Sequence, residues 1–167
     1  MSKMGLTLDA NAIGVGSWGD HMLSVEGGVT GGVTLGVMVR GDEFAMGPQG
    51  GVAYSLMDGR ENHTLGWYAG LRADFLTPLI GDCFWGVRIA GDYRGEQFIL
   101  SELIEHGFDA SLLFQFAWQN RTNHPVRQSA EESATLFAVG PWFAYFPESE
   151  RAIAGIEVAV GFDPFIS

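Results

Sequence analysis

Over most of the chain, large apolar residues alternate with small or polar residues at a period of two. The longest example runs from Met22 to Val39, where the face that carries Val33 and Leu35 alternates with a face of glycine and threonine. Successive side chains of a β-strand point to opposite faces, so this pattern predicts strands. Seven segments follow it, at residues 6–12, 22–39, 52–56, 65–75, 85–92, 108–118 and 152–162, and an eighth predicted strand, at residues 135–146, is almost wholly apolar.

Turn residues separate these segments, as Asp58-Gly59 and Gly81-Asp82 illustrate. Residues 96–106 are the exception, because their apolar residues recur at intervals of three to four and predict a short loop helix. No linker or change of composition divides the chain. We therefore predict one all-β domain over residues 1–167, a single antiparallel up-and-down β-barrel of about eight strands.

Pro141 lies inside the apolar segment 135–146. Proline has no backbone N–H to donate to a sheet, so it fits a strand only at a bulge or at an edge. We expect one of these at Pro141.

The alternation alone does not say whether the apolar face points into a core or outward into lipid. The opposite face is decisive, because it consists mainly of Gly, Ala, Ser and Thr with single charged residues between them. Small residues and paired charges suit the crowded lumen of an eight-stranded barrel. The residues predicted to form this lumen charge network are Glu26, Arg72, Asp74, Arg88, Asp92, Arg94, Asp109 and Glu157. They form either a salt-bridged plug or the lining of a pore.

The basic residues support this interpretation. Lys3 is the single lysine, and every other basic residue is arginine. Water-facing strands normally use lysine freely, whereas the planar guanidinium suits confined ion pairs.

Large aromatic residues occur on the apolar face near the ends of the predicted strands. In a membrane barrel they would form an aromatic girdle at each interface. The residues predicted for this role are Trp67, Phe75, Trp85, Trp118, Trp142 and Phe162.

In this pattern the chain resembles the small eight-stranded outer-membrane β-barrel proteins of Gram-negative bacteria, such as the OmpA transmembrane domain and OmpW. The most characteristic stretches are residues 67–74 (WYAGLRAD) and 156–165 (IEVAVGFDPF). The resemblance implies an outer-membrane location, lipid as the surrounding partner, and a structural role, an interaction role or a narrow passage for small apolar molecules.

Composition excludes several other classes. The formal net charge of −11 disfavours binding to nucleic acid. No run of 18 apolar residues predicts a transmembrane helix. The first residues, Met-Ser-Lys-Met-Gly, contain no apolar segment typical of a signal peptide, so we expect none here. Cys83 is the single cysteine, which excludes a disulfide framework within the chain.

No motif predicts catalysis, a metal or a cofactor. Residues 14–19 match G-x-G-x-x-G, but a strand pattern follows them instead of the helix that a phosphate site requires. The four histidines (His21, His63, His106 and His124) lie in or beside predicted turns without metal-ligand spacing. An outer-membrane lipid hydrolase is the enzymatic alternative, and Asn62-His63-Thr64 is its nearest candidate.

Two further alternatives remain open from the sequence. A soluble β-barrel could bind an apolar ligand with its aromatic residues turned inward. An apolar belt could also face other copies of the chain in an oligomeric assembly.

Overall fold

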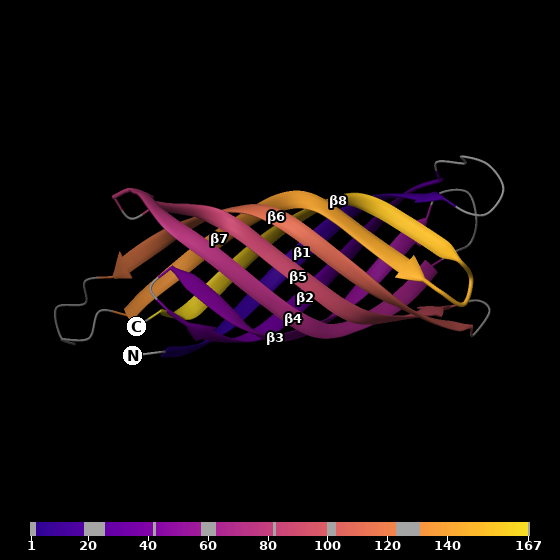
Figure 1. The fold of residues 1–167 in the computed structure, drawn as a ribbon, viewed down its shortest axis with the longest axis horizontal. Coiled ribbons are helices and arrows are strands. Elements are labelled where there is room, and N and C mark those ends of the chain that lie inside the picture. Colours follow the sequence, from indigo (N-terminus) through magenta and orange to yellow (C-terminus); the bar gives the residue numbers. More distant parts are fainter. Residues whose placement is uncertain are drawn as a thin grey trace.

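The protein forms a closed antiparallel β-barrel of eight strands in the order β1 to β8. The structure is a computed structural model and describes residues 3–18, 26–41, 43–57, 63–81, 83–99, 103–122 and 131–166. The strands are β1 (Lys3–Trp18), β2 (Glu26–Arg40), β3 (Phe44–Met57), β4 (His63–Ile80), β5 (Cys83–Phe98), β6 (Ile104–Thr122), β7 (Glu131–Phe146) and β8 (Arg151–Ile166). Both termini lie at the same end of the barrel (Figure 1). All eight predicted strand segments are confirmed, except that residues 22–25 of the second segment lie outside the described residues.

The strands are strongly staggered around the barrel. The stagger can be measured by moving from each strand to the directly paired residue of the next strand until the circuit returns to β1. A circuit that starts at Leu8 ends at Trp18, through Leu35, Gly50, Ala69, Tyr93, Phe108, Tyr145 and Ala152. The path therefore returns ten residues away from its start, the difference between positions 8 and 18. A stagger of this kind requires the strands to tilt by roughly 35–45° from the barrel axis. Figure 1 shows this tilt along the whole barrel.

The period of two separates the inner and outer faces of each strand. On β2 the outward Val33, Leu35 and Val37 are exposed, whereas the inward Thr34 and Met38 are buried. The same phase holds around the barrel, so most large apolar side chains point outward, and the polar side chains point inward together with some apolar ones such as Met38 and Leu113. The inner face is the core of this molecule.

The helix predicted at residues 96–106 is wrong. Glu96, Gln97 and Phe98 continue β5, Ile104 to His106 begin β6, and the described residues form no helix. Residues 100–102 lie outside the described part. Glu96 and Glu105 are both inward-facing and pair directly across the two strands. Their strand alternation, rather than the three-to-four spacing of the apolar residues, determines the structure.

Pro141 lies within β7 at neither a bulge nor an edge, which corrects the expectation from the sequence. It pairs with Ile156 of β8, and on the β6 side the paired residues run from Phe114–Val139 to Ser111–Trp142. Both strands advance by three residues between these pairs, so no extra residue is inserted. Because proline has no N–H to donate, pairing with β6 is interrupted at Pro141, while pairing with β8 continues.

Candidate functional site: a charged lumen inside an apolar exterior

Most of the described inward-facing charged residues form two ion-pair clusters, one deep in the barrel and one near its mouth. The structure places seven of the residues predicted for the lumen network inside the barrel, each at most 9% exposed: Arg72, Asp74, Arg88, Asp92, Arg94, Asp109 and Glu157. The side chain of Glu26, the eighth predicted residue, lies outside the described part.

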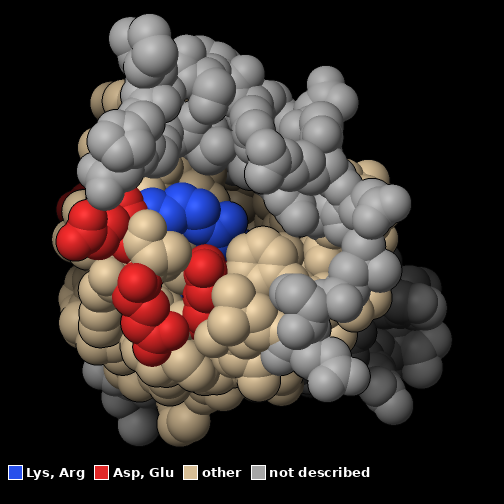
Figure 2. Space-filling view, turned by 90° about the vertical axis from the view of Figure 1, so that its right-hand side faces the viewer, with Lys and Arg blue, Asp and Glu red and all other residues tan. Residues whose placement is uncertain are grey.

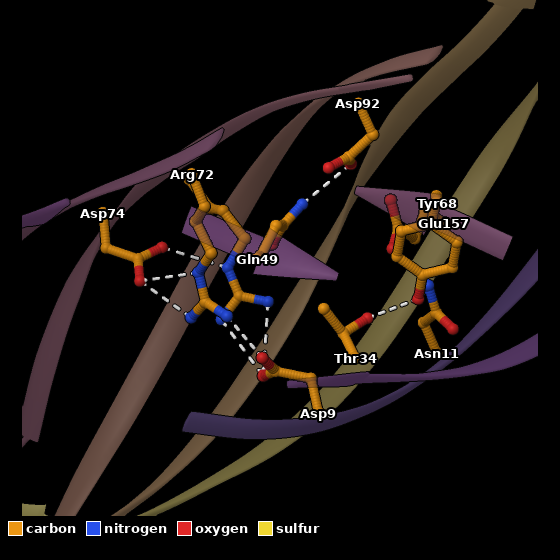
Figure 3. A network of polar contacts seen from close by, with 10 residues as sticks. Asp9, Asn11, Thr34, Gln49, Tyr68, Arg72, Asp74, Asp92 and Glu157 are labelled. Atoms are coloured by element: carbon orange, nitrogen blue, oxygen red, sulfur yellow. Dashed lines mark hydrogen bonds and ion pairs between the residues drawn. The ribbon is translucent and has the colours of Figure 1, made fainter. Parts of the chain in front are cut away.

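The deep cluster joins two arginines to two aspartates. Arg72 donates from Nε to Oδ2 of Asp74 at 2.8 Å and also binds Asp9 through Nη1. Arg88 donates from Nε to Oδ1 of Asp74 at 3.0 Å and reaches Asp9 at 3.4 Å. The side chains are between 1% and 5% exposed. Two positive and two negative charges thus compensate one another across the lumen, from β1 to β4 and β5 (Figure 3).

The mouth cluster is larger, more acidic and partly exposed. Arg94 donates to Glu96 at 2.9 Å and to Asp109 at 3.1 Å. Arg151 contacts Glu96 and Glu105, each at 2.9 Å, and its side chain is 21% exposed. Seen from this end, basic side chains lie in the mouth with acidic side chains beside them (Figure 2).

Polar side chains that hydrogen-bond to one another, without an ion pair, fill the section between the clusters. Tyr68 and Thr34 share a hydrogen bond, Gln49 donates to Asp92 at 2.8 Å, and Asn11 donates to Glu157 at 3.0 Å (Figure 3). They line a cavity of about 30 Å³. That volume holds about two water molecules, whereas ligand pockets are typically about 300–1,000 Å³.

Trp142 contradicts the prediction that it belongs to an outward aromatic girdle. It is 5% exposed and lies inside the lumen, where the guanidinium of Arg94 is 5.3 Å from its ring centroid. Segment 135–146 is apolar on both faces, so the sequence pattern could not distinguish its inward from its outward positions. The cation–π contact with Arg94 stabilises the indole among the charged groups of the lumen.

The other predicted girdle residues point outward and are 44–51% exposed. Phe75, Trp85, Trp118 and Phe162 lie toward the end of the barrel that holds the termini, and Trp67 lies toward the other end. Tyr54, Tyr93, Phe108 and Tyr145, which the sequence analysis did not single out, join Trp67 at its level. The exterior therefore has one aromatic band of Phe and Trp and one that also contains Tyr.

The two bands are separated by a nearly constant distance. Trp85 and Tyr93 are eight residues apart on β5, and Phe108 and Trp118 are ten apart on β6. With a rise of about 3.3 Å per residue and a tilt of about 40°, these intervals span roughly 20–25 Å along the axis.

No outward-facing strand residue whose side chain the structure describes is Asp, Glu, Lys or Arg. Between the bands this surface is made of residues such as Val33, Leu71, Ile89, Leu112 and Phe114, all at least 43% exposed. The polarity of the barrel is thus the reverse of that of a water-soluble protein, with charge inside and apolar surface outside.

Glycines on the inner face make room for the polar side chains. A Cβ at Gly161 would lie 2.0 Å from Oδ1 of Asp9, and a Cβ at Gly51 would lie 2.5 Å from the hydroxyl of Tyr68. The glycine-rich composition therefore has a packing reason at these positions, because the polar side chain of the directly paired residue lies over the glycine of the neighbouring strand.

Sequence reasoning missed several lumen residues. Asp9 alternates with apolar residues in segment 6–12, so its phase indicated an inward position. Glu96 and Glu105 were assigned to a helix, which hid their common face. Arg151 immediately precedes the last predicted strand, and no pattern identified its partners.

The remaining candidates that the structure describes do not assemble into a catalytic or metal site. His63 lies on the exterior with its Nδ1 2.7 Å from the hydroxyl of Tyr54, and Asn62 is outside the described residues. His21 and His124 also lie outside them. Within the described ranges, no group of three or more His, Cys, Asp or Glu residues is arranged to hold a metal ion. No helix there is long and apolar enough to span a bilayer.

Fold and site together define a closed eight-stranded β-barrel with a charged, filled lumen and an apolar exterior. No family model and no curated protein matches the sequence. Among solved structures, the crystal structure of Neisserial surface protein A (NspA) is similar, with a TM-score of 0.54 at 9% sequence identity, covering 96% of this chain and 97% of that chain. An outer membrane channel from Pseudomonas putida F1 aligns over 96% of this chain and 95% of its own at 10% identity, with a TM-score of only 0.29. The likeness to NspA confirms the predicted barrel fold.

Proposed function

We propose that the protein is an integral β-barrel of an outer membrane that acts as a structural or interaction protein. The observation that carries this proposal is the reversed polarity of the barrel. An outward surface whose described side chains include no Asp, Glu, Lys or Arg would be costly in water, and it matches the hydrocarbon interior of a bilayer.

The dimensions of the barrel support the same environment. The strands contain 14 to 19 residues, more than the roughly 9–11 that a tilted strand needs to cross a bilayer. The aromatic bands are roughly 20–25 Å apart, which fits an apolar zone about 25 Å tall between two interfacial girdles. NspA, whose fold is similar, is by its name a surface protein.

The lumen favours an interaction role over a passage. Ion pairs cross it at two levels, and Met38, Ala117 and Leu136 are buried on the side of the deep cluster nearest the termini. A small apolar molecule would have to displace buried charged groups, which is unfavourable. A soluble barrel that binds an apolar ligand would need a large apolar cavity in its interior. The cavities found among the described residues are instead small and lined mainly by polar residues.

The partner that we propose is therefore the lipid of the membrane. Association with other copies of the chain stays a prediction. We also propose no enzymatic activity, since the outward His63 is bonded to Tyr54 and no nucleophile accompanies it among the described residues.

A direct test is the behaviour of the purified protein with and without detergent, followed by reconstitution. We expect the folded protein to require detergent or lipid, to shift in mobility when heated on a semi-native gel, and to give no stable conductance in a planar bilayer. A protein that is monodisperse without detergent would contradict the membrane location. Reproducible single-channel steps would contradict the closed lumen and favour a passage.

A further inference from the structure

The barrel interior holds more carboxyl groups than arginines. Its described charged side chains are the carboxyl groups of Asp9, Asp74, Asp92, Glu96, Glu105, Asp109 and Glu157 and the guanidinium groups of Arg72, Arg88, Arg94 and Arg151. Seven carboxyl groups minus four guanidinium groups leave three negative charges without a cation if every group is ionised. The mouth cluster accounts for one of them, because three acidic side chains face two arginines there. The other two belong to Asp92 and Glu157, which form no ion pair with a described residue and accept hydrogen bonds from neutral amides.

Asp92 lies directly beside Asp109. The two residues are paired across β5 and β6, and both point inward, with 7% and 9% of their surface exposed. Like charges at directly paired positions repel, and the repulsion is strong where water does not screen it. The two side chains are also in hydrogen-bonding contact with each other. Since an ionised carboxylate only accepts hydrogen bonds, this contact requires a proton on one of the two.

The other contacts of the pair favour Asp92 as the residue that carries the proton. Oδ2 of Asp109 accepts a hydrogen bond from Nη1 of Arg94 at 3.1 Å, and this positive charge stabilises the ionised form. Oδ2 of Asp92 accepts only from the neutral Nε2 of Gln49, at 2.8 Å (Figure 3). Oδ1 of Asp92 is buried over Gly70, where a Cβ would lie 2.5 Å from it, and has no donor among the described residues. A buried carboxylate oxygen without a donor is costly, so the neutral acid fits this place better.

No described arginine compensates Asp92 from the surrounding strands. The titratable and charged side chains that line the same cavity are those of Asp9, Tyr68, Arg72, Arg88, Arg94, Asp109 and Glu157. The arginines among them bind the carboxylates of the deep and mouth clusters. Glu157 adds a negative charge to the cavity, which makes a second charge on Asp92 still less favourable. A proton is thus the simplest compensation for Asp92.

We propose that Asp92 and Asp109 hold one proton between them in the folded barrel near neutral pH, and that its release destabilises the barrel. With the proton, Asp92 donates to the Asp109 carboxylate while it accepts from Gln49, so hydrogen bonds join β3, β5 and β6. When the proton passes to water, Asp92 becomes a second carboxylate beside Asp109. In the unfolded chain the aspartates are solvated and have already released their protons, so stability falls as the pH rises. This inference concerns the lumen and does not depend on what surrounds the barrel.

Infrared difference spectroscopy of the folded protein between about pH 6 and pH 9 tests the proposal, because ordinary carboxyl groups are ionised throughout this range. The C=O band of a protonated carboxyl group is separate from the bands of carboxylates. We expect this band at the lower pH and its loss at the higher pH, and we expect Asp92→Asn to lack it. The matched control Glu157→Gln removes a neighbouring lumen carboxyl that also accepts from an amide, and it should keep the band.

Urea unfolding at the same two pH values provides a second measurement. In the unmodified protein the urea midpoint should fall by roughly 1 M from the lower to the higher pH. In Asp92→Asn the fall should be less than half as large, because the neutral amide cannot lose a proton there. The histidines titrate in both proteins, so the difference between the two responses isolates Asp92.

Two results would overturn the proposal. One is the absence of a protonated-carboxyl band from the unmodified protein at about pH 6. The other is an Asp92→Asn variant that keeps the band or responds to pH as the unmodified protein does. If Asp92→Asn lacks the heat-dependent gel shift of a folded barrel, Glu157→Gln decides. A band that persists in Glu157→Gln supports the proposal, whereas its loss there would assign the proton to Glu157 and overturn it.

Discussion

The deep and mouth clusters use the same residue types in different surroundings. In the deep cluster Arg72 and Arg88 balance Asp9 and Asp74, and each side chain is at most 5% exposed. In the mouth cluster Arg94 and Arg151 face Glu96, Glu105 and Asp109, and Arg151 reaches water. A buried charge that loses its partner is strongly destabilising, whereas a solvated one is screened. Breaking the deep cluster should therefore cost more stability than removing Arg151, the partly exposed cation of the mouth cluster.

The largest effect should follow from breaking the deep cluster. Arg72→Met leaves Asp9 and Asp74 with Arg88 alone, and should lower the free energy of unfolding by about 3–5 kcal/mol. Urea titration of the protein in lipid vesicles measures this quantity. The double variant Arg72→Met, Asp9→Leu restores the balance of charge and should be less destabilised than the single variant. A loss below about 1 kcal/mol for Arg72→Met would mean that the deep cluster contributes no more to the free energy of unfolding than a surface ion pair does.

A smaller effect should follow from crowding the deep cluster without removing a charge. In Gly161→Ala the new Cβ would lie 2.0 Å from Oδ1 of Asp9, so the aspartate must move. We expect a loss of about 1–3 kcal/mol in the same titration. Gly14→Ala is the matched control on the outer face of β1, where a Cβ meets nothing within 4 Å, and it should change stability by less than about 0.5 kcal/mol. Equal effects of the two substitutions would mean that the inner glycines have no packing role.

The smallest effect of the three should come from the mouth cluster. Arg151→Met removes the contacts with Glu96 and Glu105, but Glu96 keeps Arg94, and the side chains of Arg151 and Glu105 are 21% and 11% exposed. We expect a loss of at most about 1 kcal/mol. The exposed Glu148→Gln in the adjoining turn serves as a control and should leave unfolding unchanged. A loss as large as that of Arg72→Met would remove the distinction between the two clusters.

The barrel and most of its lumen charges could be predicted because both depend on a period of two. Arg72 and Asp74, or Arg88 and Asp92, share a face wherever the strand pattern is continuous, and the small residues on that face identified it as the lumen. Trp142 was misplaced because both faces of its segment are apolar. Glu96 and Glu105 were missed because a short apolar run near a strand end imitates helical spacing.

Other features depend on the stagger, which the sequence pattern does not contain. Asp9 meets Arg72 and Arg88 because β1 lies across the lumen from β4 and β5, a relation that only closure of the barrel creates. The space that Gly161 leaves for Asp9 depends on the same register between β1 and β8. The second aromatic band likewise becomes visible only when Tyr93, Phe108 and Tyr145 are aligned by strand pairing.

The central claim is that the outward face contacts lipid. Spin labels attached to cysteines in a Cys83→Ala background test it most directly, with Leu112 in the middle of β6 compared with Glu148 in an exposed turn. In reconstituted vesicles we predict that the label at position 112 collides often with oxygen and rarely with a water-soluble nickel complex, and that the label at position 148 behaves in the opposite way. A folded barrel in which both positions are equally accessible to the nickel complex would contradict this account.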